Sequence, residues 1–469
     1  METPPGAILV NDIHSALNAT RVARLIEPAG MEALVEVVKA AREAGAQLSL
    51  CGGRHAMGGQ QFGTDTWLLD LRGHAAIHSL DQERGLVTVD AGIQWPELIA
   101  GTAAWQSPVA WGIRQKQTGA DRLTLGGALA ANIHGRGLRM PPIVSDVEAF
   151  TLIDAQSGVR RCTRAENADL FALAIGGYGL FGIVADVTLR LMPRVKVERR
   201  VEVLTLDELI RVPEERDTHE WLYGDFQYSI DEHSPDFLRR GVFSAYHRIA
   251  DDRPVPAGQS ELHAADWERL LALAHTDRAR VFEEYAAYYL STHGQLYWSD
   301  THQLGMYLDH YHEALDRRLG AVHRASEMIT EIYVPRPALA AFMERAAELL
   351  RGGGVPVIYG TIRLIERDDE SFLAWAREPW ACIIFNLHTE HTSAGIAAAQ
   401  TVFRRLIDLA IGFGGSYYLT YHRWATRAQV EACHPRFREF LLEKRARDPG
   451  ELFTSGWYRH HRELFAGEA

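Results

Sequence analysis

Three glycine-rich stretches are the strongest chemical signal in this 469-residue chain, and the first is GGRHAMGGQ at positions 52–60. It directly follows a short apolar run that has the pattern of a strand. Successive backbone amides in such a loop converge into a hollow that binds anions, so a diphosphate could be held there without cationic side chains. The alternative is a tight turn that leaves Arg54 and His55 in solvent.

The second stretch, GADRLTLGGALAANIHG at positions 119–135, is rich in glycine, alanine and small polar residues. Side chains this small let the backbone approach a flat ligand closely. They would equally permit a close contact between two helices. This stretch alone therefore does not decide between a ligand site and simple packing.

The third stretch, GGYGLFG at positions 176–182, contains the spacing GxGxxG. The dinucleotide-binding fingerprint must follow a strand and open a helix. Here the preceding residues 165–174 have a helical pattern, and residues 183–191 alternate as a half-buried strand does. Because this context is inverted, we exclude a Rossmann-type site.

Histidine and cysteine are common metal ligands, and the chain has 21 histidines and 4 cysteines. Histidine spacings such as His310–His312 and His388–His391 do not form HExxH or another recognised ligand pattern. We therefore predict no metal site and disfavour a metal hydrolase. The cysteines stand far apart and form no CxxC, which disfavours a disulfide framework and indicates a reducing cytoplasm.

The elements predicted around these stretches fall into two zones. Up to about residue 195, strand patterns alternate with helix patterns; from 196 to 415 the mixture is typical of an α+β domain with an antiparallel sheet. The predicted strands are 24–27, 47–50, 66–71, 85–91, 147–153, 183–191, 198–204, 224–230, 329–334 and 380–387. The predicted helices are 31–44, 95–104, 165–174, 266–274, 336–351 and 394–413, and the last fifty or so residues are also helical.

Composition and charge exclude several classes of protein. The chain has 47% hydrophobic and 23% charged residues, the balance of an ordinary globular protein. Its net charge of −12 argues against binding to nucleic acid or anionic lipid, which needs a basic face. No apolar run is long enough to span a membrane, and the first residues lack the pattern of a signal peptide.

The order of four motifs resembles a known flavoprotein family. GGRHAMGG, VTVDAGIQWPEL, TLGGALAANIHG and GGYGLFGIVADVTLRLMP follow one another as in the FAD-binding domain of the vanillyl-alcohol oxidase and para-cresol methylhydroxylase (PCMH-type) superfamily. TIRLIERDD, SYYLTYHRWAT and ARDPGELF, further along the chain, are similar to the aldonolactone and alditol oxidases and decaprenylphosphoryl-ribose oxidase. The resemblance implies FAD and a two-domain α+β fold. Residues 1–195 would bind FAD, 196–415 would form a cap domain with an antiparallel sheet, and 416–469 would return to the FAD domain.

The resemblance also implies which residues contact the cofactor. The pyrophosphate cradle would be Gly52, Gly53, Arg54, His55, Ala56, Met57, Gly58, Gly59 and Gln60. The flavin would be lined by Gly119, Thr124, Leu125, Gly126, Gly127, Ala131, Asn132, Ile133 and His134, with the backbone of Ile183 and the side chain of Tyr418.

His55 occupies the place where many family members bond a histidine to the 8α-methyl group of the flavin. That reaction requires a neutral imidazole, which an ordinary histidine pKa near 6.5 allows. Members with this histidine commonly follow it with serine, whereas Ala56 follows it here. A noncovalent flavin, with His55 as a packing residue, is the alternative.

Catalysis in this family needs a base for a hydroxyl proton and a cation near the negative charge that develops on the flavin. Arg363 matches the arginine of the EIR motif of alditol oxidases, but Thr361 replaces its glutamate. Tyr421 replaces the active-site lysine, so Tyr421 or His422 would handle the proton. Ile133 stands where a small residue would admit oxygen, which favours an electron acceptor other than O2.

We therefore predict a cytoplasmic FAD-linked oxidase or dehydrogenase. It would remove hydride from a small alcohol, lactol or sugar-like carbon centre and pass the electrons to O2 or another acceptor. The alternative is a flavin-retaining binding or assembly protein without turnover, because the glutamate and lysine of the family are missing. Two aromatic runs, 221–230 and 285–290, would form either ordinary core or an aromatic wall of the substrate pocket.

Overall fold

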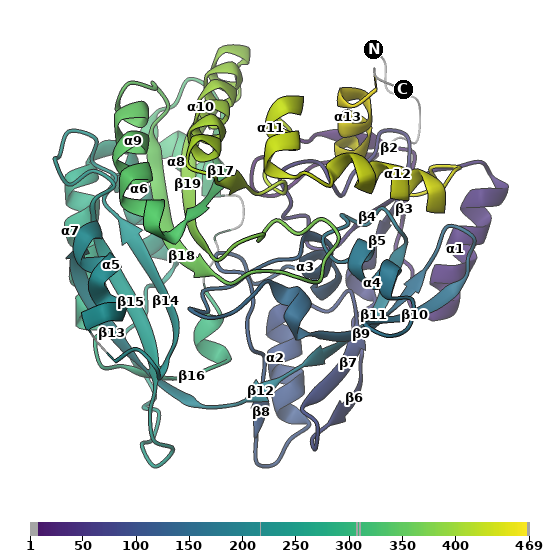
Figure 1. Cartoon of the computed structure of the whole chain (residues 1–469), viewed down its shortest axis with the longest axis horizontal. Coiled ribbons are helices and arrows are strands. Elements are labelled where there is room, and N and C mark those ends of the chain that lie inside the picture. Colours follow the sequence, from purple (N-terminus) through teal and green to yellow (C-terminus); the bar gives the residue numbers. More distant parts are fainter. Residues whose placement is uncertain (1–7, 216, 306–307, 309–310, 467–469) are drawn as a thin grey trace.

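The computed structural model of the protein describes residues 8–215, 217–305, 308 and 311–466. Its sheets form two parts that lie side by side (Figure 1). The part on the right of Figure 1 takes its strands from the first 193 residues, and the part on the left takes its strands from residue 196 onwards.

The first part begins with a small parallel sheet in the order β3 (Arg24–Ile26), β5 (Trp67–Asp70), β4 (Leu48–Cys51). Helix α1 (Met31–Glu43) connects β3 to β4, and parallel strands require such a crossover. The buried face of α1 consists of Leu34, Val38 and Ala41, whose spacing keeps them on one side of the helix. A hairpin of β1 (Ile8–Val10) and β2 (Thr20–Val22) precedes this sheet.

An antiparallel sheet lies next to it in the same part. Its order is β10 (Val159–Thr163), β9 (Val147–Ile153), β11 (Ile183–Arg190), β7 (Leu86–Asp90), β6 (Ile77–Asp81). In β11 the buried residues alternate with half-buried ones, as expected for a strand packed on one face. The accompanying elements are α2 (Trp95–Ala104), α3 (Leu125–Ala131), α4 (Ala168–Ala174), β8 (Trp111–Gly112), β12 (Met192–Pro193) and 3₁₀ turns at Leu71–Gly73 and Ile143–Asp146.

The second part is built on one large antiparallel sheet. Its order is β16 (Leu296–Trp298), β13 (Lys196–Thr205), β15 (Arg240–Arg248), β14 (Trp221–Tyr228), β18 (Val357–Ile365), β19 (Trp380–Glu390), β17 (Ala325–Pro335), β20 (Ser416–Tyr417). Its helices are α5 (Leu206–Glu215), α6 (Ala264–Thr276), α7 (Arg278–Ser291), α8 (Tyr311–Leu319), α9 (Leu339–Arg351) and α10 (Ser393–Gly412), with 3₁₀ turns at Thr301–Gln303 and Arg336–Ala338.

Helices α9 and α10 cover one face of this sheet and form the main core with it. Phe342 and Met343 of α9 and Phe403 and Leu406 of α10 are fully buried in one apolar cluster with residues of β17 and β19. The opposite face of β17 and β19 is thereby left for the first part of the molecule. This arrangement confirms the predicted α+β fold with an antiparallel sheet.

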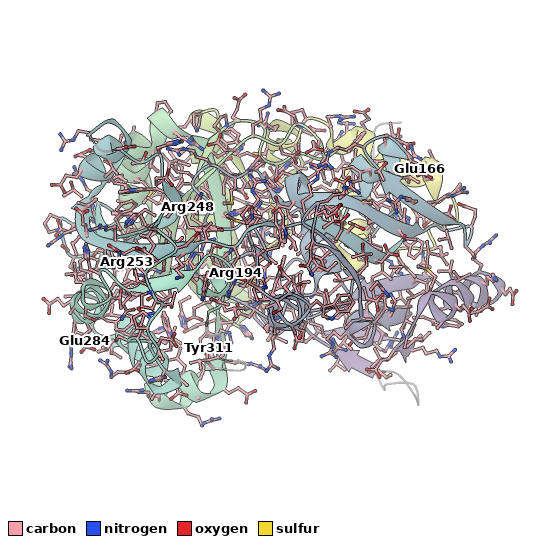
Figure 2. All side chains as sticks on the ribbon, turned by 90° about the horizontal axis from the view of Figure 1, so that it is seen from below. Glu166, Arg194, Arg248, Arg253, Glu284 and Tyr311 are labelled. Atoms are coloured by element: carbon pink, nitrogen blue, oxygen red, sulfur yellow. The ribbon has the colours of Figure 1, made fainter. Side chains whose placement is uncertain are left out.

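An ion pair marks the junction of the two parts. Arg194 lies near the middle of Figure 2, in the short segment between β12 and β13. Its Nε is 2.8 Å from Asp300 Oδ2, and its guanidinium lies 4.2 Å from the ring centre of Trp298. The side chains of Arg194 and Asp300 are both largely buried. Their contact therefore fixes the direction in which β13 leaves the first part.

The C-terminal segment returns to the first part through α11 (Arg427–Cys433), α12 (Phe437–Arg447) and α13 (Gly456–Leu464). These helices lie along the top of Figure 1, between α10 and the strands of the first part. The backbone of Leu48 in β4 accepts a hydrogen bond from Thr454 and donates one to Leu452. The domain limits at 195 and 415 themselves stay a prediction. Among the described residues, no helix combines the length and apolar character needed to cross a membrane.

Phe453 tests how far this return stabilises the fold. Its side chain is fully buried among Leu34, Leu48 and Leu69. Phe453→Ala should lower the free energy of unfolding by about 3–5 kcal/mol through lost burial and a residual cavity. Leu442→Ala on α12, a residue that is 63% exposed, should change it by less than about 0.5 kcal/mol. Thermal and urea unfolding of both variants measure the difference, and equal losses would contradict this packing role.

Candidate active site

A cavity of about 970 Å³ lies between the two parts, and all three glycine-rich stretches line it. This volume is at the upper end of the range for sites that bind small molecules and cofactors. The first part contributes glycine loops and the start of α3, while the second part contributes side chains of β17, β18 and β19. The cavity therefore has one wall made mostly of backbone and another made mostly of side chains.

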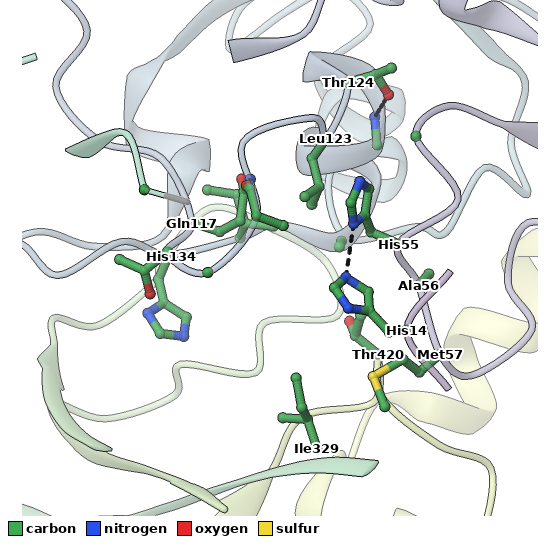
Figure 3. A pocket seen from close by; sticks show the side chains of 18 of the residues that line it. His14, His55, Ala56, Met57, Gln117, Leu123, Thr124, His134, Ile329 and Thr420 are labelled. Carbon is green, nitrogen blue, oxygen red and sulfur yellow. Dashed lines mark hydrogen bonds between the residues drawn. The ribbon is translucent and has the colours of Figure 1, made fainter. Parts of the chain in front are cut away.

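The backbone wall is possible because two of the glycine stretches touch each other. A Cβ atom on Gly52 would lie 2.1 Å from Oγ1 of Thr124, and one on Gly53 would lie 2.1 Å from the carbonyl oxygen of Arg122. No larger residue fits at either position without moving the second stretch. Thr124 is held in place because its hydroxyl oxygen accepts a hydrogen bond from the amide of Gly127 (Figure 3).

His55 faces a second histidine across one end of the cavity. The Nδ1 atom of His55 is 2.8 Å from Nε2 of His14 (Figure 3). Burial, with the nearby His312, lowers the pKa of His14 to about 3, so its ring is neutral. His14 therefore fixes the orientation of the His55 ring without placing a charge beside it.

Arg54 lines the cavity and pairs with a buried carboxylate, Asp70. It has a left-handed backbone conformation with φ of +59°, and its guanidinium is 3.0 Å from Asp70. Burial disfavours the charged form of Asp70, but hydrogen bonds from Arg72 and the charge of Arg54 outweigh it and lower the pKa of that carboxyl. Arg54 therefore shares the single negative charge of Asp70 with Arg72.

The opposite wall carries a buried carboxylate, Glu331 of β17. Its Oε1 accepts hydrogen bonds from His134 Nε2 and the Tyr333 hydroxyl, both at 2.6 Å, and its Oε2 accepts one from the Tyr421 hydroxyl at 3.2 Å. Burial alone would raise the pKa of this carboxyl. The charge of His134, these hydrogen bonds and the charge of Arg363 instead lower it to about 2, so Glu331 is ionised.

The hydrogen-bond partners of His134 indicate its protonation state. Nδ1 is 3.0 Å from the carbonyl oxygen of Gly135, and Nε2 is 2.6 Å from Glu331. Both partners only accept hydrogen bonds, so each ring nitrogen must carry a proton. His134 and Glu331 therefore form a buried imidazolium–carboxylate pair across the two parts of the molecule.

Arg363 and Tyr421 stand on the same wall. Arg363 comes from β18 and is largely buried, and its Nε has no hydrogen-bond partner among the described residues. Burial and the charge of Glu331 raise the pKa of Tyr421 well above its usual value, so its phenol keeps its proton and donates. Tyr418 donates from its hydroxyl to the carbonyl oxygen of Ala131, which brings the C-terminal segment over the glycine-rich wall.

Most of the predicted site residues line this cavity. They are Gly52, Gly53, Arg54, His55, Ala56, Met57, Gln60, Gly119, Thr124, Gly126, Gly127, Ala131, Ile133, His134, Arg363, Tyr418 and Tyr421. The predicted residues outside the cavity wall are Gly58, Gly59, Leu125, Asn132, Ile183 and His422.

Each of these outlying residues has a partner elsewhere. Leu125 and Ile183 lie in the apolar cores, although Gly182 and Val184 beside Ile183 do line the cavity. The Asn132 amide donates to Asp368. The amide of Gly58 donates to the carbonyl of Thr420, and Gly59 packs close to Asn18.

His422 was predicted from the sequence as a proton carrier, but the structure places its side chain away from the cavity. Its ring is buried against Phe403 and Trp424, with ring centres 4.6 Å and 5.5 Å away. Burial lowers its pKa to about 3. Its side chain lies outside the cavity, so it does not reach a substrate there.

Two residues of the site were missed from the sequence, His14 and Glu331. A signal for Glu331 was present in ASEMITEIYVP, where Glu327, Ile329 and Glu331 alternate within an otherwise apolar strand. Alternate residues of a strand share a face, and all three line the cavity. His14 lies in an irregular segment, and no local pattern singles it out.

The residues around the cavity fit FAD. One wall offers closely approaching backbone that suits a diphosphate and a flat ring, and the other offers cationic and hydrogen-bonding groups. Buried polar atoms on the wall also lack hydrogen-bond partners within the described ranges: Gln60 Oε1, Gln61 Oε1, Thr118 Oγ1 and Arg363 Nε. Buried polar atoms are rarely left unsatisfied, so these indicate a polar ligand.

Comparison with known proteins points to the same cofactor. Residues 22–163 match the model of an FAD binding domain family. Decaprenylphosphoryl-beta-D-ribose oxidase of Mycolicibacterium smegmatis is 24% identical over 94% of this chain and 95% of its own length. L-gulono-1,4-lactone dehydrogenase of Mycobacterium tuberculosis is 23% identical over 93% and 95%, and L-gulonolactone oxidase of Bos taurus is 25% identical over 39% and 40%.

The matched domain contains the first two glycine-rich stretches, and two of these relatives align over nearly their full length. All three relatives are named as oxidases or dehydrogenases. These similarities support a PCMH-type flavoprotein near the aldonolactone oxidases and decaprenylphosphoryl-ribose oxidase, and the chain is an FAD-dependent oxidoreductase.

Proposed function

We propose that this enzyme oxidises a carbon that bears a hydroxyl group in a small sugar-like alcohol, lactol or lactone, and passes the electrons to O2 or another acceptor. The observation that carries the proposal is the cavity itself. Arg363, Tyr421 and the His134–Glu331 pair share it with the glycine-rich stretches. We assign FAD binding to residues 1–195 and 416–469, and substrate binding to residues 196–415.

Bound flavin supplies the two-electron oxidation, and the side chains position the substrate and manage charge and protons. Arg363 presents a positive charge and an N–H group without a partner among the described residues, in a largely buried place. A fixed cation in such a setting stabilises negative charge far better than in water. His134 holds a second positive charge on the facing glycine-rich wall, paired with Glu331.

Tyr421 and Glu331 form a route for the hydroxyl proton of the substrate. Tyr421 can take a proton on its phenolic oxygen as its own proton moves to Glu331 Oε2, 3.2 Å away. The phenol is restored, and Glu331 carries the proton only in transit because its pKa is held at about 2. Tyr421 thus acts without becoming a phenolate, which its raised pKa disfavours.

The substrate side of the cavity suits a molecule with many hydroxyl groups. Tyr288, Tyr289 and Tyr359 line it together with the amides of Gln227 and Asn386. Aromatic faces pack on sugar C–H groups, and amides bond their hydroxyls. The relatives named above act on a ribose derivative and on gulonolactone, which supports this substrate class.

A flavin-retaining protein without turnover is the second candidate. It was suggested by the absence of the family glutamate and lysine, but Glu331 supplies a carboxylate in the cavity and Tyr421 connects to it. The polar cluster therefore favours an enzyme. All four cysteines are free thiols, and on this ground we place the enzyme in the cytoplasm.

Anaerobic mixing with sugar-like alcohols and lactones tests the reaction. The purified yellow protein should be bleached by at least one member of this class. Arg363→Met should keep the bound flavin but slow bleaching by about 10²–10³-fold, the usual loss for a group that stabilises developing charge. Arg345→Met, at an arginine that is 62% exposed on α9, should bleach at the wild-type rate. Failure of every such compound to bleach the wild type would favour the non-catalytic candidate.

Two substitutions test the proton route. Tyr421→Phe should lower the rate of bleaching by about 10²–10⁴-fold, the range for loss of a general acid–base group. Tyr333→Phe removes another hydrogen bond to Glu331 but leaves the route intact, so its effect should be much smaller. Equal rates in these two variants would contradict the route.

The lowered pKa of Glu331 predicts how the stability of the fold changes at acid pH. Its pKa is lowered from 4.5 to about 2 in the folded state. Such a group stabilises the fold above its unfolded pKa, and that stability is lost as the pH falls towards about 2. Melting temperatures between pH 4.5 and pH 2 should therefore fall less steeply in Glu331→Gln than in the wild type.

Acid precipitation tests whether His55 binds the flavin covalently. We expect yellow colour to stay in the pellet of the wild type and to pass into the supernatant with His55→Ala. His78→Ala, which removes a half-exposed histidine beside Asp90, should behave as the wild type. Colour in the pellet of His55→Ala would exclude His55 as the sole attachment point.

A further inference from the structure

A second cluster of titratable side chains lies at the other end of β17, and the proposed reaction uses none of it. Glu327 is 6% exposed and is approached by three histidines from three other elements. His275 lies at the end of α6, His312 in the first turn of α8, and His388 in β19. Tyr311, labelled in Figure 2, marks the start of α8.

The distances within the cluster match those between ligands of one metal ion. His275 Nε2 is 3.0 Å from Glu327 Oε1, His388 Nδ1 is 3.2 Å from the same oxygen, and His312 Nδ1 is 3.4 Å from Oε2. Ligands about 2.0–2.1 Å from a tetrahedral ion are about 3.3 Å from one another. The ligand atoms of His275, Glu327 and His388 all lie within 4.8 Å of one another.

Ordinary hydrogen bonding leaves much of this cluster unsatisfied. His388 Nδ1 bonds to Glu327, but His275 Nε2, His312 Nε2 and Glu327 Oε2 have no hydrogen-bond partner in the part of the chain that the structure describes. His275 Nε2 lies 3.0 Å from Glu327 Oε1 but makes no hydrogen bond to it. A cation placed there would satisfy the nitrogen and the carboxylate together.

The rival explanation is a carboxylate neutralised by protonated histidines. One imidazolium would suffice for that, as His134 shows for Glu331. Here three imidazoles converge on one carboxylate, and two of them do not use it as a hydrogen-bond acceptor. Imidazole and carboxylate ligands together suit Zn²⁺ and its neighbours in the transition series rather than Mg²⁺ or Ca²⁺.

We propose that His275, Glu327 and His388, with His312 as the fourth ligand, bind one Zn²⁺-like divalent cation. The ion ties α6 and α8 to β17 and β19 and so closes this end of the cavity. Its route of entry is the cavity, because Glu327 and His312 line it. The inference is independent of the flavin reaction, since the ion stabilises structure and takes no part in electron transfer.

Metal analysis of the holoprotein tests the site directly. Protein dialysed against a chelator and then against Zn²⁺ should retain about one ion per chain and melt at a higher temperature than the metal-free protein, since binding to the folded state stabilises it. Mg²⁺ should give neither effect. Co²⁺ should give the visible bands of a tetrahedral nitrogen and oxygen site in a difference spectrum against metal-free holoprotein.

Alanine substitutions of the proposed ligands test where the ion binds. His275→Ala and His388→Ala should each lose the retained Zn²⁺ and the gain in melting temperature while still binding flavin. His78→Ala, which removes a histidine 2.6 Å from the Asp90 carboxylate elsewhere, should retain both. Equal Zn²⁺ in the wild type and the cluster variants would overturn the proposal. If the variants do not fold, the wild type alone decides, because absence of Zn²⁺ uptake and of the Co²⁺ bands would also overturn it.

Discussion

The buried pair of His134 and Glu331 holds the two parts of the molecule in the relation that creates the site. A charged carboxylate and an imidazolium removed from water are costly unless they are paired and hydrogen-bonded. Here His134 comes from the glycine-rich wall and Glu331 from the large sheet, so each charge is stable only while the two parts stay together. The same contact places positive charge and a carboxylate on the cavity wall.

Neighbouring residues reinforce this junction. The amide group of Asn132 donates to Asp368, the indole of Trp375 donates to the carbonyl of Asn132, and the Tyr418 hydroxyl donates to the carbonyl of Ala131. All of these bonds join the end of α3 and the residue after it to the second part or to the C-terminal segment. Asn132 therefore matters although it lies outside the cavity wall: it positions His134 two residues later.

The sequence predicted the parts of this arrangement that depend on local pattern. The glycine-rich stretches and the inverted context of GxGxxG identified the backbone wall, and α2 and β9 begin and end where their periodicity indicates. Strand β18 was missed because its apolar run is interrupted by Gly360 and preceded by three glycines. His14 and Glu331 were missed because their roles come from partners distant in sequence, which no local spacing encodes.

The sequence also could not decide whether Tyr421 or His422 handles the proton, because the answer depends on residues distant in sequence. The two adjacent residues lie in an irregular turn after β20, and one enters the cavity while the other enters the core. Both side chains are polar, so residue type alone does not distinguish their roles. In the structure the ring of His422 packs between Phe403 and Trp424, whereas the Tyr421 hydroxyl donates a hydrogen bond to Glu331.

Sheet register explains how the site keeps a carboxylate although Thr361 stands where the resemblance implies a glutamate. Thr361 in β18 and Glu331 in β17 both pair with Ile384, which lies between them in β19. Residues directly opposite one another in an antiparallel sheet project to the same face. Glu331 therefore lies in the same row of side chains as Thr361, two strands away, on the face that holds Arg363 and Ile384 against the cavity. A carboxylate supplied from this row remains next to the arginine, and Tyr421 connects it to the substrate side.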